Sequence, residues 1–117
     1  MVDQITAALA AATAAEAKLV VYVGASWCEP CQYFHRAVTA GKLDEALSNV
    51  RFLEFDADVD GERLAEVGFD SHLIPLFVVP DSAGRPTDKR IEGGIKGPAS
   101  TQHIMARLTA MLARPPG

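Results

Sequence analysis

An apolar segment that leads directly into a pair of cysteines constrains the fold of this 117-residue chain most strongly. Residues Lys18–Gly24 are mostly apolar and rich in valine without clear alternation, which is typical of a strand buried on both faces. Cys28 and Cys31 follow after a short connection, and Pro30 suits the first turn of a helix. We therefore predict a buried strand, a turn and a helix that begins at the cysteine pair.

The remaining elements follow from periodicity and from turn residues. We expect strands at 18–24, 50–56, 76–79 and 89–92, and helices at 2–17, 28–40, 61–67 and 98–112, before a tail at 114–117. A strand–helix–strand start predicts a parallel crossover, and the tight turn at 81–84 predicts an antiparallel addition. The expected fold is α/β, with a central mixed four-stranded sheet flanked by helices on both faces, in one domain over residues 1–117.

Composition and charge narrow the class of protein. Hydrophobic residues make up 49% of the chain, which is enough for a core. The net charge is −4 without a basic run, so we expect no nucleic-acid partner. The strongly apolar run Leu19–Val23 is far shorter than the roughly 20 residues of a membrane span. The alanine-rich start is preceded by Asp3 and has no cation before Lys18, so we interpret it as a helix of the domain and not a signal peptide.

The two cysteines are the candidate chemical site. Thiol–disulfide exchange needs a thiolate that attacks and a second thiol that resolves the mixed disulfide. A helix N-terminus stabilises a thiolate at Cys28, which we expect to face solvent and act as the nucleophile, with Cys31 as the resolving thiol. Half of a zinc site, with His35 nearest in sequence, and an inert pair of core cysteines are the alternatives. We expect no metal.

The residues around this pair resemble a known family. The segment Trp27-Cys28-Glu29-Pro30-Cys31 resembles the W-C-G-P-C active site of thioredoxins, with glutamate in place of the usual glycine. On this motif the chain is identified as a member of the thioredoxin superfamily, with a thioredoxin-like three-layer fold. The resemblance implies that Trp27 shields the disulfide and that Glu29 and Pro30 support the site.

The resemblance continues beyond the motif, over about residues 18–112. Ile74-Pro75 resembles the cis-proline of the family, and Gly94 or its neighbour falls where the family places a glycine. The resemblance implies that Ile74, Pro75 and Gly94 bind substrate. Isoleucine before the proline is the residue type of reducing thioredoxins, which favours a reductase over an oxidase or isomerase.

The resemblance also implies the activity and the partners. We expect a thiol–disulfide oxidoreductase that reduces protein disulfides and is itself regenerated by an external reductase or electron donor. No nucleotide-binding glycine motif is present, so we expect no cofactor beyond the Cys28–Cys31 disulfide. We expect a monomer. A redox switch or adaptor without turnover, and an extracytoplasmic reductant or oxidant, are the alternatives.

Three features depart from the family pattern or leave a choice open. In this chain Tyr22 replaces a buried aspartate that, in the family, handles the proton of the resolving thiol, and Phe52 replaces the lysine beside that aspartate. We therefore expect the proton to be handled differently and the protein to act on a narrower range of partners. Glu29 could oppose the thiolate, carry a proton or simply suit the helix dipole.

The location of the protein is a separate question, because the W-C-E-P-C motif also occurs in extracytoplasmic relatives. We expect a cytoplasmic location, and a periplasmic or secreted one if a leader has been removed.

Other chemistry-bearing residues receive weaker assignments. His35 lies two helical turns from Cys28, about 10 Å, which is too far for a direct base. His72 could contact substrate at the rim. Asp56, Asp58 and Asp60 match the first half of a calcium loop, but the second half fails, so we expect helix capping from Asp58 or Asp60 instead.

Overall fold

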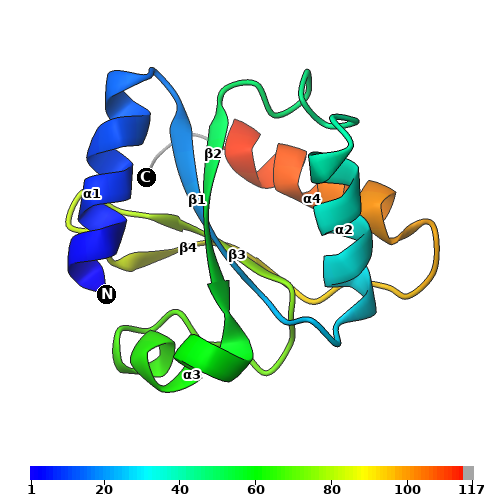
Figure 1. Cartoon of the computed structure of the whole chain (residues 1–117). Coiled ribbons are helices and arrows are strands. Elements are labelled where there is room, and N and C mark those ends of the chain that lie inside the picture. Colours follow the sequence, from blue (N-terminus) through cyan, green and yellow to red (C-terminus); the bar gives the residue numbers. More distant parts are fainter. Residues whose placement is uncertain (115–117) are drawn as a thin grey trace.

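A mixed four-stranded sheet runs through the middle of the computed structural model, which describes residues 1–114 (Figure 1). Its strand order is β2-β1-β3-β4. β1 and β2 are parallel, whereas β3 is antiparallel to both β1 and β4. In chain order the elements are α1 (Val2–Ala14), β1 (Lys18–Gly24), α2 (Glu29–Thr39), β2 (Val50–Asp56), α3 (Ala57–Glu66), β3 (Leu76–Pro80), β4 (Pro86–Glu92) and α4 (Ser100–Ala113).

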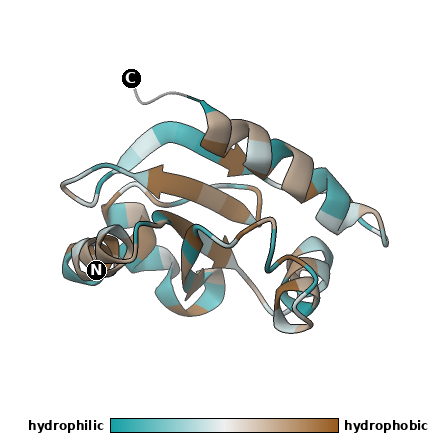
Figure 2. Cartoon of the chain, turned by 90° about the horizontal axis from the view of Figure 1, so that it is seen from above, coloured by the Kyte–Doolittle hydropathy of each residue, from teal (hydrophilic) through white to brown (hydrophobic). Residues whose placement is uncertain are grey.

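Each face of the sheet carries its own apolar cluster. Val21 and Val23 of β1 pack with buried residues of α1 and α3, whereas Val20 and Tyr22 point the opposite way and pack with buried residues of α2 and α4. This alternation is the period of two expected of a strand. Figure 2 shows the result, with hydrophobic strands at the centre and hydrophilic residues on the outer sides of the helices. The structure confirms the predicted three-layer α/β architecture.

The strand ranges predicted for β1 and β2 are confirmed residue by residue. α2 begins one residue after Cys28, which is its N-cap. Gly41 follows the C-cap of this helix with φ of +77°, a left-handed conformation that glycine adopts without strain. The connection to β2 consists of turns, one of which is closed by the Leu47 N–H donating to the Leu43 carbonyl at 2.9 Å.

The starts of α3 and β4 differ from the sequence prediction by three residues or more. α3 was expected to be capped by Asp58 or Asp60, and this is wrong because the Asp56 side chain accepts the hydrogen bond of the Asp58 N–H at 2.8 Å. Asp56 is therefore both the last residue of β2 and the helix N-cap. β4 begins at Pro86, three residues earlier than predicted, and it is an edge strand, where a proline costs no ladder hydrogen bond.

α1 ends at Ala14, three residues before its predicted end. The predicted tail begins at Arg114, and its residues 115–117 lie outside the described residues.

Candidate active site

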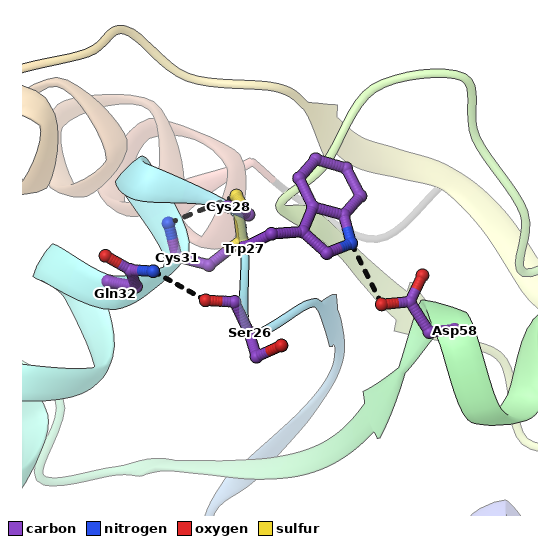
Figure 3. The surroundings of a disulfide bond; sticks show 6 residues. All are labelled: Ser26, Trp27, Cys28, Cys31, Gln32 and Asp58. Carbon is purple, nitrogen blue, oxygen red and sulfur yellow. Dashed lines mark hydrogen bonds between the residues drawn. A yellow bond between two sulfur atoms is a disulfide. The ribbon is translucent and has the colours of Figure 1, made fainter.

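The cysteine pair lies at the N-terminus of α2, directly after the connection from β1. Cys28 and Cys31 form a disulfide with Cα atoms 5.2 Å apart (Figure 3). The Cys31 backbone N–H donates a hydrogen bond to the Cys28 Sγ at 3.3 Å. The sulfur of Cys28 thus occupies the N-cap position, where the free N–H groups and the helix dipole stabilise a thiolate.

The expected exposure of Cys28 is not found. Cys28 and Cys31 are each only 4% exposed in the disulfide form. The two sulfurs are bonded to each other, so each covers part of the other's surface. Burial therefore does not distinguish a nucleophile from a resolving thiol in this state, and the assignment of Cys28 as nucleophile rests on its N-cap position.

Trp27 projects from the site into solvent. Its side chain is 67% exposed, and its indole N–H donates a hydrogen bond to the Asp58 carboxylate at 2.9 Å (Figure 3). On the other side, the Gln32 side-chain amide donates to the Ser26 carbonyl at 2.5 Å. These two contacts hold the connection between β1 and α2 on both sides of the cysteines. Sequence reasoning missed Asp58 as a site residue, because it considered this aspartate only as a cap or a calcium ligand.

The predicted cis-proline is present. The Ile74–Pro75 peptide bond is cis, and Pro75 is buried. The Pro75 carbonyl accepts a hydrogen bond from the Gly93 N–H at 2.8 Å. A side chain on Gly94 would place its Cβ 3.1 Å from the Cβ of Pro30. The structure therefore places Gly94 against Pro30, which lies between the two cysteines in the sequence, and ties the neighbouring Gly93 to Pro75. The binding of substrate by Ile74, Pro75 and Gly94 stays a prediction.

A cleft of about 820 Å³ opens on the Cys31 side of the pair. Tyr22 and Glu54 line this cleft together with Cys31. A Cβ added to Gly24 would meet the Tyr22 hydroxyl at 3.1 Å and the Cys31 Sγ at 3.3 Å, so both groups lie beside the same backbone position. The residue that replaces the family's aspartate thus presents a hydroxyl near the Cys31 sulfur.

Tyr22 keeps this hydroxyl neutral over a wide pH range. Burial, and to a lesser extent the negative charge of Glu54, raises the pKa of the Tyr22 phenol well above its usual value. Glu54 is the register partner of Tyr22 on the neighbouring strand β2. A neutral phenol therefore stands beside Cys31 where the family pattern has a buried carboxylate.

The second family departure, Phe52, belongs to an aromatic cluster beneath the site. The centroid of the Tyr22 ring lies 4.8 Å from that of Phe77 and 6.3 Å from that of Phe52. Phe34 of α2 packs edge-on against Phe77 at 5.1 Å. Aromatic pairs at these separations stabilise a core beyond their area burial. The cluster anchors α2 on the sheet and leaves no cation where the family has a lysine.

Glu29, the residue that replaces the family's glycine, makes its side-chain contact with a distant part of the sequence. Its carboxylate accepts a hydrogen bond of 2.7 Å from the backbone N–H of Gly97. None of the three roles considered for Glu29 from the sequence includes this contact, which joins residues 68 positions apart.

The three histidines and the aspartates contribute no metal centre to the described part of the chain. His35 lines the cleft beside Cys31, whereas His72 is exposed on the segment before Pro75. Within residues 1–114, no group of three or more His, Cys, Asp or Glu side chains is arranged to hold a metal ion. The same residues contain no helix that is long and apolar enough to cross a membrane.

The fold and the site together define a thioredoxin-fold protein with a disulfide-forming CxxC pair, an arrangement that supports thiol–disulfide exchange. A family model described as thioredoxin-like matches residues 1–82. The chain belongs to this family, which confirms the resemblance predicted from its sequence.

Individual relatives agree with this membership. The chain is 38% identical to a thioredoxin of Aspergillus fumigatus over 76 residues, a match that spans 65% of this chain and 66% of that relative. A thioredoxin structure from Fasciola hepatica is 26% identical with a TM-score of 0.54 and covers 82% of each chain. The oxidised mitochondrial thioredoxin 3 of Saccharomyces cerevisiae is 27% identical with a TM-score of 0.54, over 80% of this chain and 77% of that one.

Proposed function

We propose that the protein is a thiol–disulfide oxidoreductase that reduces disulfides in protein substrates. The observation that carries this proposal is the position of Cys28, whose sulfur caps α2 and accepts the Cys31 N–H while bonded to the Cys31 sulfur. A sulfur in this position is stabilised as a thiolate, and the second sulfur needed to release the product is already within bonding reach.

The reaction proceeds in two exchange steps. In the reduced protein, the Cys28 thiolate attacks one sulfur of the substrate disulfide, which forms a Cys28–substrate disulfide, and the other substrate sulfur leaves as a thiolate that takes up a proton. Cys31 then loses its proton and attacks the Cys28 sulfur. The Cys28–Cys31 disulfide forms and the second substrate sulfur leaves as a thiol. Two electrons pass to the substrate, and the protein ends in the oxidised state of this structure.

The second step requires a path for the Cys31 proton. Cys31 is 4% exposed and borders the cleft that also contains Tyr22, Glu54 and His35. The neutral Tyr22 hydroxyl can donate a hydrogen bond toward the developing thiolate, and solvent in the cleft can carry the proton away. Proton release on this side of α2 leaves the Cys28 side free for substrate.

The protein needs a supply of electrons in order to act repeatedly. Because turnover leaves the pair oxidised, an external reductase or electron donor must return two electrons for each substrate disulfide. The cysteine pair itself carries these electrons, with no additional cofactor. A reducing compartment such as the cytoplasm suits this direction of electron flow.

The test is the reduction of insulin disulfides with dithiothreitol as the electron donor. We expect the protein to accelerate the reaction well above the rate with dithiothreitol alone, and a Cys28→Ser variant to fall back to that rate. An adaptor or switch without turnover would form the Cys28–Cys31 disulfide but give no acceleration. That result would overturn the proposed function.

A further inference from the structure

We propose that Glu29 is a positioning residue that fixes the loop of residues 93–97 as part of the surface on which a protein substrate docks. This inference rests on the proposed function and adds a specificity determinant to it. Glu29 lies between the two cysteines but acts through the loop and not on the sulfur atoms.

The first anchor of the loop is the Glu29 carboxylate itself. Glu29 is in the first turn of α2 and is only partly exposed. Its Oε1 accepts the Gly97 N–H at 2.7 Å, and this hydrogen bond is also partly buried. A hydrogen bond to an ionised carboxylate is stronger than one between neutral groups, and partial burial protects it from competition with water. The contact therefore holds the far end of the loop against the cysteine helix.

The second anchor lies at the start of the loop. The Gly93 N–H donates to the Pro75 carbonyl at 2.8 Å, and the Arg107 guanidinium donates to the carbonyls of Gly93 and Glu92, each at 2.8 Å. The loop therefore runs from Pro75, in the cis-proline segment, to Glu29 at the start of α2. Figure 1 shows this yellow-to-orange segment, between β4 and α4, passing the start of α2.

Only a glycine-rich loop can follow this path, and such a loop is not stiff by itself. Gly93 and Gly97 have φ of +75° and +93°, which are left-handed conformations that favour glycine. Glycine gives the free loop many alternative conformations. The hydrogen bond from Gly97 to Glu29 selects one of them before substrate arrives, and such preorganisation lowers the cost of binding.

The residues between the anchors are available to a partner. Ile95 is 43% exposed, and Lys96 is exposed beside it. Two further apolar side chains are exposed near the ends of this surface, namely Trp27, next to Cys28, and Leu73, whose Cβ would lie 3.3 Å from a Cβ on Gly93 at the start of the loop. Exposed apolar side chains on either side of a reactive disulfide suit an extended peptide with apolar residues beside its cysteine. Fixing the loop fixes the place of Ile95 on this surface.

The experiment compares two substitutions at the same position. Glu29→Gln keeps an oxygen that can accept the Gly97 N–H but removes the charge, whereas Glu29→Ala removes both. The control is Glu45→Ala, which removes one negative charge beyond the far end of α2. For each variant, kcat/KM is measured for insulin and for hydroxyethyl disulfide, a small substrate that cannot span the docking surface. The exchange of the Gly97 amide hydrogen and the equilibrium potential of the cysteine pair are measured alongside.

The proposal predicts that the ratio of kcat/KM for insulin to that for hydroxyethyl disulfide falls about tenfold in Glu29→Ala, mainly through KM for insulin. In Glu29→Gln this ratio stays within about twofold of the native value, and the Gly97 amide stays protected from exchange. In Glu29→Ala this amide exchanges at least about tenfold faster. Glu45→Ala leaves the ratio unchanged.

Two outcomes would overturn the proposal. If Glu29→Gln and Glu29→Ala shift the potential and both substrates alike, the charge of Glu29 acts on the cysteines and the loop is not its target. If Glu29→Ala leaves both the ratio and the Gly97 exchange at native values, the hydrogen bond positions nothing. Failure of the proposed function itself is distinguishable, because the native protein would then reduce neither substrate.

Discussion

The indole of Trp27 is hydrogen-bonded to the carboxylate of Asp58 at 2.9 Å, so the residue before the cysteine pair is held by the first turn of α3. The parallel pairing of β1 and β2 explains how residues 31 positions apart come together. Gly24 and Asp56 are register partners at the ends of these strands, and the segments that follow the two strands leave the sheet at the same edge. The segments that follow the carboxyl ends of β1 and β2 therefore form one side of the active site.

The first prediction concerns this contact. Asp58→Ala removes the acceptor, so we expect the oxidised protein to lose about 1 kcal/mol of unfolding free energy and the Trp27 fluorescence to change in intensity and wavelength. Asp58→Asn keeps an acceptor oxygen and is expected to retain most of the native spectrum. Since Trp27 is the sole tryptophan of the chain, its fluorescence reports the contact directly. Equal spectra for the alanine variant and the native protein would show that the contact is not formed in solution.

The second prediction separates the two cysteines. In a Cys31→Ser variant the mixed disulfide at Cys28 cannot be resolved. Incubation with a protein disulfide should therefore accumulate a covalent complex between the variant and the substrate, which dithiothreitol separates by reducing the disulfide between them. A Cys28→Ser variant should form no such complex. Non-reducing electrophoresis and mass spectrometry measure both. A stable complex through Cys31 in the Cys28→Ser variant would reverse the assigned roles.

The third prediction uses the titration of Tyr22. Its pKa is raised in the folded protein, mainly by burial, whereas in the unfolded chain it titrates near its usual value of about 10. The unfolded chain therefore loses this proton first. The stability that depends on neutral Tyr22 is complete below about pH 10 and falls by about 1.4 kcal/mol for each pH unit above it.

A Tyr22→Phe variant should not show that loss. Denaturant unfolding of the two proteins between pH 8 and about 11 measures the difference, which should grow in favour of the variant only above about pH 10. Tyr33→Phe, in the same helix as Cys31, controls for removal of a phenol elsewhere. Parallel pH curves for Tyr22→Phe and the native protein would mean that Tyr22 is not buried as a neutral group.

The fourth prediction concerns the narrow space between Tyr22 and Cys31. A methyl group in Gly24→Ala would lie 3.1 Å from the Tyr22 hydroxyl and 3.3 Å from the Cys31 Sγ, so at least one neighbour must move. We expect a loss of about 1–3 kcal/mol in stability and slower release of the mixed disulfide.

Gly61→Ala is the matched control, because its added Cβ meets nothing within 4 Å and lies in a helix. We expect this control to be neutral or stabilising by up to about 1 kcal/mol. Unfolding curves and single-turnover kinetics measure both variants. Native stability and native release in Gly24→Ala would contradict the close approach.

The strands and the cysteine helix could be predicted because their signals are local. The valine-rich run of β1 and the hydrophobic pattern of β2 specify strands without any knowledge of their neighbours. Pro86 concealed the start of β4, because a proline is compatible with a strand only at a sheet edge, and the position of an edge depends on the whole topology. Asp56 concealed the start of α3, because β2 continues into the helix without a loop.

The site was predictable to the extent that it consists of short motifs. Cys28, Cys31 and the cis bond before Pro75 follow from segments of two to five residues. The contacts of Asp58 with Trp27 and of Glu29 with Gly97 join residues that only tertiary packing brings together. No periodicity or spacing could identify them. The prediction that Cys28 faces solvent was wrong for a related reason, because the burial of this residue depends on the partner sulfur and on the surrounding fold.

The equilibrium between the dithiol and disulfide forms of Cys28 and Cys31 in glutathione buffers, followed by Trp27 fluorescence, shows whether this pair can act as a reductant. We expect a reversible two-electron transition with one intramolecular disulfide and a potential below about −200 mV, toward the roughly −270 mV of thioredoxin. Such a pair can reduce protein disulfides. A potential above about −200 mV would contradict the proposed direction of electron flow. The absence of any Cys28–Cys31 disulfide in all buffers would contradict the account of the site altogether.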